Sequence, residues 1–272
     1  MKEKSRLAIL GAGTIGVSIA KGLARFGRYA AADITLTRRK AHMLDACKRE
    51  GFDVRTTNTE AVKAAAVIVV AVEPQQLDVL LEEISAALVP GTHTLISVVS
   101  GATIAQITGK IGKKVPVVRA MPNTAVAIGE SMTCIAAATP SADGVDTARA
   151  IFDVVGKTLV IEEEQMIAAT SLGACGIAFF LRAIRAASQG GIEIGFHAGD
   201  ALVIASQTAK GAAALVLNSK EHPEHEIDRV TTPRGCTISG LNQMEHEGFS
   251  SAMIKGIITS ARKASGLYSD EK

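Results

Sequence analysis

The chain has 272 residues, of which 47% are hydrophobic and 21% are charged, and its formal net charge is +2. A chain of this length and composition can bury one large core or two ordinary ones. The small net charge excludes the strong field that draws proteins to nucleic acids or acidic membranes. Trp is absent and only 3% of residues are aromatic, so aromatic platforms for stacked bases are not expected.

The four cysteines are widely separated, at Cys47, Cys134, Cys175 and Cys236, and no two have CxxC spacing. Free thiols in a reducing cytoplasm fit this spacing better than a disulfide framework does. No run reaches the roughly 18 uninterrupted apolar residues of a membrane span. We therefore expect a cytoplasmic protein without a membrane or nucleic-acid partner.

Short apolar runs alternate with helix-like stretches through the first part of the chain. A helix is expected from the glycine-rich segment to about Phe26, and a charged helix over residues 39–50. Strands that alternate with helices predict a doubly wound α/β sheet. The six predicted strands lie at residues 6–10, 34–37, 52–56, 67–72, 94–100 and 115–121.

The pattern changes after about residue 162. Small and apolar residues dominate residues 164–218, followed by a predicted polar loop over 219–235 and two helices over 237–266. We therefore predict a Rossmann-like domain at residues 1–162 and an α-helical domain at residues 163–272. The acidic residues 162–164 mark the junction and are expected to form a solvated first helical turn.

A glycine-rich segment, GAGTIG, follows the first predicted strand and begins a helix. In a dinucleotide site the first glycine permits a tight turn, the second lets the backbone approach a pyrophosphate, and the third lets the helix pack on the strand. The alternative is a glycine-rich turn without a ligand. The expected cofactor-binding residues here are Gly11, Ala12, Gly13, Thr14, Ile15 and Gly16.

The end of the second strand indicates which dinucleotide is bound. An acidic residue there would accept hydrogen bonds from an NAD ribose, but the strand ends in Thr37 and continues with Arg38 and Arg39. A hydroxyl and guanidinium groups suit a 2′-phosphate, so NADP(H) is predicted, with NAD as the other candidate. The alternative for these residues is an ordinary basic start of a helix.

Two further strand ends are expected to line the cofactor site, because ligands of open α/β sheets lie outside the carboxyl ends of the strands. Pro74 ends the fourth strand and leaves the backbone of Ala71 and Val72 available to a nicotinamide ring. Met121 and Asn123 lie at a similar proline turn. Either turn could equally be purely structural.

Near the end of the chain, VTTPRGCTISG (230–240) predicts a tight loop against a helix N-terminus. The structural alternative is a threonine-capped helix after a Pro-Gly turn. His222, His225 and His246 lie near acidic residues, but their open, polar loop favours solvated side chains over a metal site.

Characteristic strings through nearly the whole chain resemble those of the pyrroline-5-carboxylate reductase family. The most specific of them is VTTPRGCTISGLNQMEHEGF (230–249). The others are GAGTIG (11–16), TRR (37–39), Asn58, AVEPQ (71–75), SGATIAQI (100–107), VRAMPNT (118–124), SQTAKGAA (206–213) and the weaker LGACGIAF (172–179).

The resemblance implies an NAD(P)H-dependent reduction of the cyclic imine pyrroline-5-carboxylate to L-proline, the last step of proline biosynthesis. It implies a homodimer formed by interlocking C-terminal helices, which can assemble further, with Asn58 among the cofactor contacts. The substrate lies between the nicotinamide of one subunit and the PRGCT loop of the partner. Backbone N–H groups hold its carboxylate, and the Thr237 hydroxyl bonds its ring nitrogen as the catalytic residue. The implied substrate-binding residues are Thr232, Arg234, Gly235, Cys236 and Thr237.

Some residues depart from the family pattern. Arg234 replaces a usual glycine, which predicts that this position does not need a positive φ and adds a guanidinium for the carboxylate. Glu73 replaces a lysine and brings a negative charge near an anionic substrate, unless it points away or pairs with a base such as Arg234. LGACGIAF lacks the family's Ser, Pro and Tyr. Two alternatives therefore remain: reduction of another cyclic imine, or a catalytically inactive NADP-binding regulatory homologue.

Overall fold

The computed structural model describes residues 6–138, 143–219 and 221–268. Contacts divide the chain into two compact units. The first unit runs to Cys175 and takes in the chain again from Ser260, and the second unit holds Gly176–Thr259.

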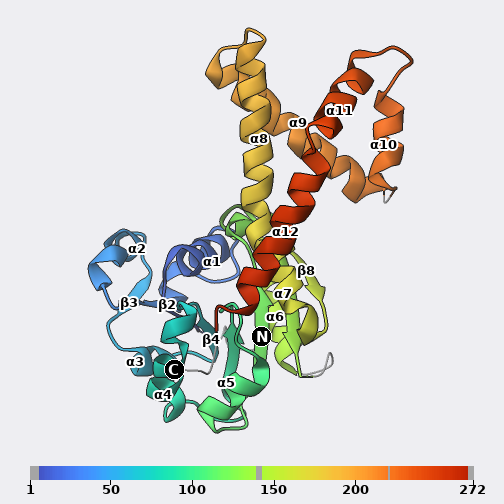
Figure 1. The fold of residues 1–272 in the computed structure, drawn as a ribbon. Helices are drawn as coiled ribbons and strands as arrows, with labels where there is room; N and C mark the ends of the chain where they lie inside the picture. The colour runs from blue at the N-terminus through green and yellow to red at the C-terminus, as the bar shows by residue number, and fades with distance from the viewer. Residues whose placement is uncertain (1–5, 139–142, 220, 269–272) are drawn as a thin grey trace. The chain divides into compact units, whose positions relative to one another are not determined.

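The first unit is built on one eight-stranded sheet with the order β3-β2-β1-β4-β5-β6-β7-β8 (Figure 1). All neighbouring strands are parallel except β6 and β7, which are antiparallel. The six predicted strands are confirmed, whereas β7 and β8 were missed. The strands are β1 Leu7–Leu10, β2 Ile34–Thr37, β3 Asp53–Arg55, β4 Val67–Val70, β5 Thr94–Ser97, β6 Val117–Met121, β7 Ser131–Ala137 and β8 Gly156–Val160.

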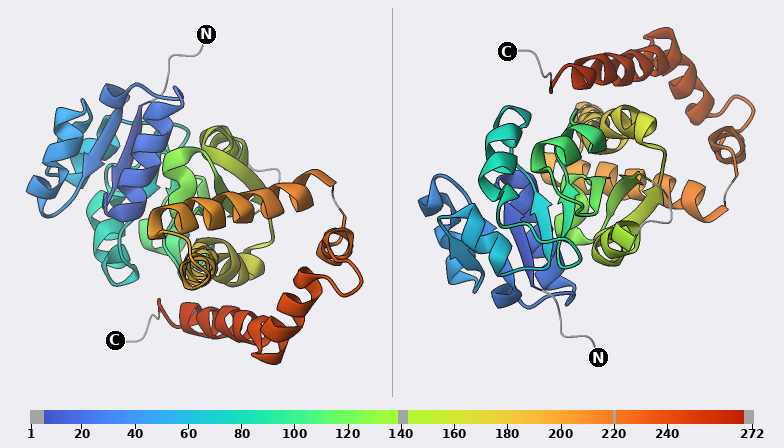
Figure 2. Two further views of the ribbon diagram at one scale, coloured as in Figure 1. Left: turned by 90° about the horizontal axis from the view of Figure 1, so that it is seen from above. Right: turned by 90° about the horizontal axis from the view of Figure 1, so that it is seen from below.

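Each face of the sheet has its own core. Leu7 and Ile9 of β1 pack into the cluster under α1 (Thr14–Arg25) and α6 (Asp143–Phe152). Ala8 and Leu10 point to the opposite cluster, under α3 (Asn58–Lys63), α4 (Leu77–Ser85) and α5 (Ile104–Ile111). Figure 2 shows the strands with helices on both sides. Alternate residues fill both cores, which explains why the central strands read as continuous apolar runs.

The segment after β2 differs from prediction. Instead of a helix over 39–50, it forms a 3₁₀ turn at Ala41–Leu44 and a short helix, α2 (Asp45–Arg49). Leu44 and Cys47, three residues apart, are its buried side chains. One helical turn is enough to bury two residues at that spacing, so a longer helix is not needed.

The first unit extends past the predicted boundary at residue 162. Met166 and Ala169 of α7 (Met166–Ala169) pack with Met121 of β6, which holds residues 163–175 in the first unit. At the other end of the chain, the Tyr268 hydroxyl donates to Asp78 Oδ1 at 2.6 Å. That the cofactor-binding and substrate-binding parts of the chain divide at residue 162 stays a prediction.

The second unit is helical. Its elements are α8 (Gly176–Glu193), α9 (Ala198–Ser219), α10 (Pro223–Val230), α11 (Cys236–His246) and most of α12 (Phe249–Ser265). The predicted polar loop over 219–235 was wrong where α10 forms. His222 Nδ1 accepts a hydrogen bond from the Glu224 N–H at 3.3 Å, and Pro223 occupies the first helical position. A side-chain cap and a proline at that position favour helix initiation despite the polar sequence.

Among the described residues, two helical stretches are long and apolar enough to cross a membrane, judged by length and composition alone. They are Glu163–Glu193, which joins several helical segments, and Ala198–Ser219. In the most apolar 18-residue part of each stretch, 17% is buried in the first and 11% in the second. Most of these apolar residues are therefore not covered by the rest of the single chain.

The cysteines are free thiols. Cys47 and Cys134 are buried, and burial raises the pKa of both thiols. A thiol with a raised pKa stays protonated and unreactive at neutral pH. Cys175 is half-buried and Cys236 is exposed.

Candidate functional site

The first glycine of the GAGTIG loop is required by its surroundings. Gly11 has φ +81°, and a Cβ there would collide with Val72 Cγ1 and lie 2.9 Å from the Val72 backbone nitrogen. A side chain at Gly11 would therefore be strained by both the backbone conformation and the contact with Val72.

The other two glycines differ from the first in what surrounds them. A Cβ on Gly13 would meet Gly11 O at 3.9 Å, so this side of the loop has room for a ligand. A Cβ on Gly16 would lie 3.1 Å from Ile9 Cγ2 and 3.5 Å from the Ala71 Cβ, where α1 packs on the sheet. Each glycine thus has the surroundings expected for its place in a dinucleotide loop.

Some backbone N–H groups of the glycine loop form hydrogen bonds within the protein, and others lie at the uncapped N-terminus of α1. Gly11 and Ala12 donate to Thr37 O at 3.2 and 2.8 Å, and Gly13 donates to Gly11 O at 2.6 Å. Gly13 is the N-cap of α1, and no side-chain hydrogen bond caps this helix. An anion would therefore be bound by the first turn of the helix at Thr14, Ile15 and Gly16, and not by the N–H groups of Gly11 and Ala12.

A chain of hydrogen bonds begins at the end of β2. The Thr37 hydroxyl donates to Asn58 Oδ1 at 2.6 Å, and Asn58 Nδ2 donates to Glu83 Oε2 at 2.8 Å. Thr37 is buried, so its hydroxyl positions Asn58 and is not exposed to a ligand. Arg38 is half-buried and Arg39 is exposed beside it. The cations expected to bind a 2′-phosphate thus lie directly after β2, the strand whose last carbonyl oxygen accepts from the glycine loop.

The end of β4 packs against the glycine loop. The Ala71 N–H donates to Leu10 O at 2.8 Å, and Val72 lies against Gly11. Pro74 begins a 3₁₀ turn for which Glu73 is the N-cap. Glu73 is exposed, and its Oε2 accepts from Gln76 Nε2 at 3.5 Å, so its charge is directed along its own turn.

The side chains of Met121 and Asn123, at the end of β6, contact other parts of the protein. Met121 is buried in a core cluster with Cys134 and Met166. Asn123 Oδ1 accepts from the Ala125 N–H at 3.0 Å, and its Nδ2 donates to Gly173 O at 3.1 Å. The Asn123 side chain thus bonds its own turn and a neighbouring segment. Both residues would therefore meet a cofactor through their backbone.

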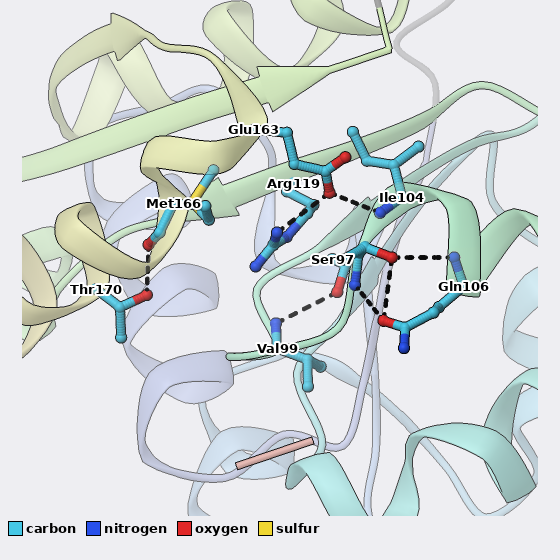
Figure 3. A network of polar contacts seen from close by, with 9 residues as sticks. Ser97, Val99, Ile104, Gln106, Arg119, Glu163, Met166 and Thr170 are labelled. Atoms are coloured by element: carbon cyan, nitrogen blue, oxygen red, sulfur yellow. Dashed lines mark hydrogen bonds and ion pairs between the residues drawn. The ribbon is translucent and has the colours of Figure 1, made fainter. Parts of the chain in front are cut away.

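Sequence reasoning missed a partly buried ion pair at Arg119 of β6 (Figure 3). Arg119 Nη1 lies 3.1 Å from Glu163 Oε1, and the same oxygen accepts from the Ile104 N–H at 2.7 Å. The Arg119 side chain is 4% exposed and Glu163 is 26% exposed. Burial lowers the pKa of Arg119, and the bond to Glu163 opposes that shift. The expectation that residues 162–164 form a solvated turn was therefore wrong for Glu163.

The loop before α11 corrects one expectation. Arg234 has φ +61°, and among the described residues it is the non-glycine residue with a positive φ. The position does need the conformation that glycine adopts most easily, and an arginine there costs roughly 1 kcal/mol or more of strain. Gly235 follows, and its N–H donates to Thr232 O at 2.9 Å. The Gly235 N–H is therefore used inside the loop and not free for a ligand.

The N-terminus of α11 is open. Gly235 is its N-cap, and no side-chain hydrogen bond caps the helix, so the threonine-capped alternative is not observed. Cys236 is exposed and Thr237 is half-buried in the first turn. Their N–H groups and the Thr237 hydroxyl can bind a carboxylate. No group of three or more His, Cys, Asp or Glu side chains in the described ranges could hold a metal ion.

The parallel sheet, the glycine loop with its three distinct glycines and the uncapped start of α1 define a Rossmann-type protein of the dinucleotide-dependent oxidoreductase class. Family models agree with this class. Residues 6–101 match "NADP oxidoreductase coenzyme F420-dependent", and residues 163–267 match "Pyrroline-5-carboxylate reductase dimerisation".

Curated relatives define the family. The chain is 52% identical to "Pyrroline-5-carboxylate reductase 1" of Dictyostelium discoideum over 98% of this chain and 50% of the relative, so it spans about half the length of that protein. It is 47% identical to "Pyrroline-5-carboxylate reductase 2" of the same organism over 97% of this chain and 94% of the relative. The chain belongs to the pyrroline-5-carboxylate reductase family.

Solved structures share the fold. The pyrroline carboxylate reductase of Plasmodium falciparum, solved with NADP bound, matches with a TM-score of 0.88 at 23% identity and covers 97% of this chain and 98% of that one. The pyrroline-5-carboxylate reductase of Coxiella burnetii matches with a TM-score of 0.86 at 26% identity, over 98% of this chain and 100% of that one.

Proposed function

We propose that this protein reduces 1-pyrroline-5-carboxylate to L-proline with NADPH as the hydride donor. The observation that carries the proposal is the pair of uncapped helix N-termini, at α1 and α11, in a chain of this family. One suits a pyrophosphate and the other a carboxylate. The two D. discoideum relatives are named for this activity.

The chemistry supplied by the cofactor is a hydride, and the protein's own contribution is positioning. A protonated imine is already electrophilic at carbon, so the step needs alignment more than an acid or a base. The N–H groups of Cys236 and Thr237 hold the carboxylate, and the Arg234 guanidinium adds a charge-assisted contact. The Thr237 hydroxyl bonds the ring nitrogen as it becomes an amine.

NADP is the proposed cofactor because of the cations after β2. Arg38 and Arg39 follow directly on Thr37, whose carbonyl oxygen holds the glycine loop. Guanidinium groups bind phosphate oxygens with paired, charge-assisted bonds. The P. falciparum neighbour, whose structure contains NADP, shares this fold.

A homodimer is proposed from the helices of the second unit. Phe180 and Leu181 of α8 and Val203 of α9 are between 58% and 68% exposed in the single chain. A second copy would cover these apolar side chains and bring a partner's α11 loop to each cofactor. Free thiols support placement in the cytoplasm.

The direct test is the decay of NADPH absorbance with purified protein and DL-pyrroline-5-carboxylate, with NADH in parallel. Stoichiometric formation of L-proline supports the proposal. A flat trace with NADPH still bound favours a different cyclic imine, which a substrate panel would identify. If the whole panel fails while NADPH binds, the protein is a regulatory homologue.

Replacing Thr237 with alanine is expected to lower kcat/KM by roughly tenfold or more, about 1.4 kcal/mol. The reason is the lost hydrogen bond to the ring nitrogen, so NADPH affinity should stay unchanged. Steady-state kinetics and a fluorescence titration measure the two quantities. The Thr237→Ser variant keeps the hydroxyl and should retain most activity, whereas full activity in Thr237→Ala would remove Thr237 from the mechanism.

Replacing Arg38 with alanine is expected to weaken NADPH binding by about 1 kcal/mol more than NADH binding, since it removes a charge-assisted contact with the 2′-phosphate. Titrations of both dinucleotides measure the difference. The Lys40→Ala variant removes a nearby exposed cation and serves as the control. Equal weakening of both dinucleotides in Arg38→Ala would refute the phosphate contact.

A further inference from the structure

A carboxylate reaches the end of β2 from another part of the sequence. The position that carries an acidic residue in NAD-binding folds holds Thr37 instead. The bonds from Thr37 to Asn58 at 2.6 Å and from Asn58 to Glu83 at 2.8 Å nevertheless connect this strand end to a carboxylate on α4. Glu83 is 25 residues from Asn58 in sequence, so no local motif reveals it.

The connection also places Glu83 relative to the glycine loop. Thr37 uses its carbonyl oxygen to accept from Gly11 and Ala12, and its hydroxyl to reach Asn58. The helix α3 lies against both β2 and α4 (Figure 1). A second bond, from Thr59 Oγ1 to Glu83 O at 3.4 Å, links α3 to α4 beside the first. Glu83 is therefore held two hydrogen bonds away from Thr37, the strand end beside which the adenosine ribose of a dinucleotide would lie.

The charge of Glu83 opposes that of Arg38 at this edge. Arg38 is half-buried and attracts a phosphate, whereas Glu83 is exposed and repels one. A carboxylate can instead accept a hydrogen bond from a free ribose hydroxyl, as the acidic residue of NAD-binding folds does. Arg38 therefore favours NADPH, whereas Glu83 favours NADH.

We propose that Glu83 is a selectivity-determining residue that weakens binding of a 2′-phosphate and thereby lets NADH compete with NADPH. The inference rests on the proposed function, because it assumes that a dinucleotide binds at α1. It deepens that proposal by assigning the balance between the two cofactors to one residue outside the glycine loop and the β2 end.

The test is the Glu83→Gln variant. Glutamine retains an oxygen that can accept from Asn58 Nδ2, so the substitution removes the charge while keeping the hydrogen bond. Glu82→Gln removes an equal charge from the preceding position of α4, which is also exposed, and is the matched control. Titrations of NADPH and NADH, and of adenosine 2′,5′-bisphosphate and 5′-AMP as fragments, give the dissociation constants without turnover.

We expect the ratio of the NADH to the NADPH dissociation constant to rise about threefold to tenfold in Glu83→Gln, with a smaller rise at high salt. The fragments should show the same shift. Glu82→Gln should change the ratio less than about twofold, because Glu83, and not Glu82, accepts the hydrogen bond from Asn58. Glu83→Lys should raise the ratio further than Glu83→Gln.

Three outcomes would overturn the inference. An unchanged ratio in Glu83→Gln and Glu83→Lys, with normal binding by the wild type, overturns it alone. An equal shift in Glu82→Gln shows a general charge effect and also overturns it alone. Failure of the wild-type protein to bind either dinucleotide refutes the proposed cofactor site, and the inference with it.

Discussion

Replacing Glu163 with alanine is expected to lower the free energy of unfolding of this protein by about 3–5 kcal/mol. The variant leaves the Arg119 guanidinium buried without its carboxylate, and Arg119 Nε already has no hydrogen-bond partner. It also removes the acceptor of the Ile104 N–H at the start of α5. Urea unfolding followed by circular dichroism measures the loss.

Two further variants separate the causes of this loss. Glu163→Gln keeps an oxygen for the Ile104 N–H but not the charge, so its loss should be smaller than that of alanine. Glu164→Ala changes the exposed neighbour and should stay within about 0.5 kcal/mol of the wild type. A loss below about 1 kcal/mol in Glu163→Ala would show that solvent replaces the carboxylate.

The second large effect is expected in the glycine loop, where alanine at two positions should fail for different reasons. Gly11→Ala should destabilise the first unit by about 2–4 kcal/mol, since the new Cβ meets Val72 at a positive φ. Gly13→Ala should fold normally, because its Cβ has open space, yet weaken NADPH binding roughly tenfold or more by occupying the pyrophosphate side. Thermal unfolding and fluorescence titration measure stability and binding separately.

A third glycine isolates the cost of the backbone conformation. Gly27 has φ +74° and nothing within 4 Å of a Cβ, so Gly27→Ala should cost only about 1 kcal/mol and leave binding intact. If Gly11→Ala costs no more than this control, the collision with Val72 relaxes and that part of the explanation is wrong. If Gly13→Ala binds NADPH as the wild type does, the pyrophosphate does not approach the loop at Gly13.

Local features of the sequence determined much of the fold. Central strands such as Val67–Val70 are buried on both faces and therefore appear as uninterrupted apolar runs. Such a run identifies a strand even when its neighbouring strands are not known. The GAGTIG string needs only its own spacing, and each glycine lies where that spacing predicts. In β8 half-buried and exposed residues alternate, and β7 mixes small polar and apolar residues. Both strands carry weaker patterns, and both were missed.

The site was predictable to the extent that its residues are neighbours in sequence. The residues of the PRGCT loop and the cations after β2 could be found as strings. The backbone conformation of Arg234 could not, because a positive φ is imposed by the loop's closure and is not signalled by an arginine. The helix α10 was missed because its polar composition resembles a loop, and only its His222 cap and Pro223 start reveal it.

Tertiary structure alone decided which distant polar groups meet. Arg119 and Glu163 are 44 residues apart, and Thr37 and Asn58 are 21 apart. A hydrogen bond depends on the distance between atoms and not on separation along the chain. The periodic patterns of helices and strands therefore cannot predict these pairs. The sequence by itself determined six of the eight strands of the sheet, the dinucleotide loop and the family. The fold decided which charged groups pair, which N–H groups remain for a ligand, and that Asn58 connects Glu83 to the end of β2.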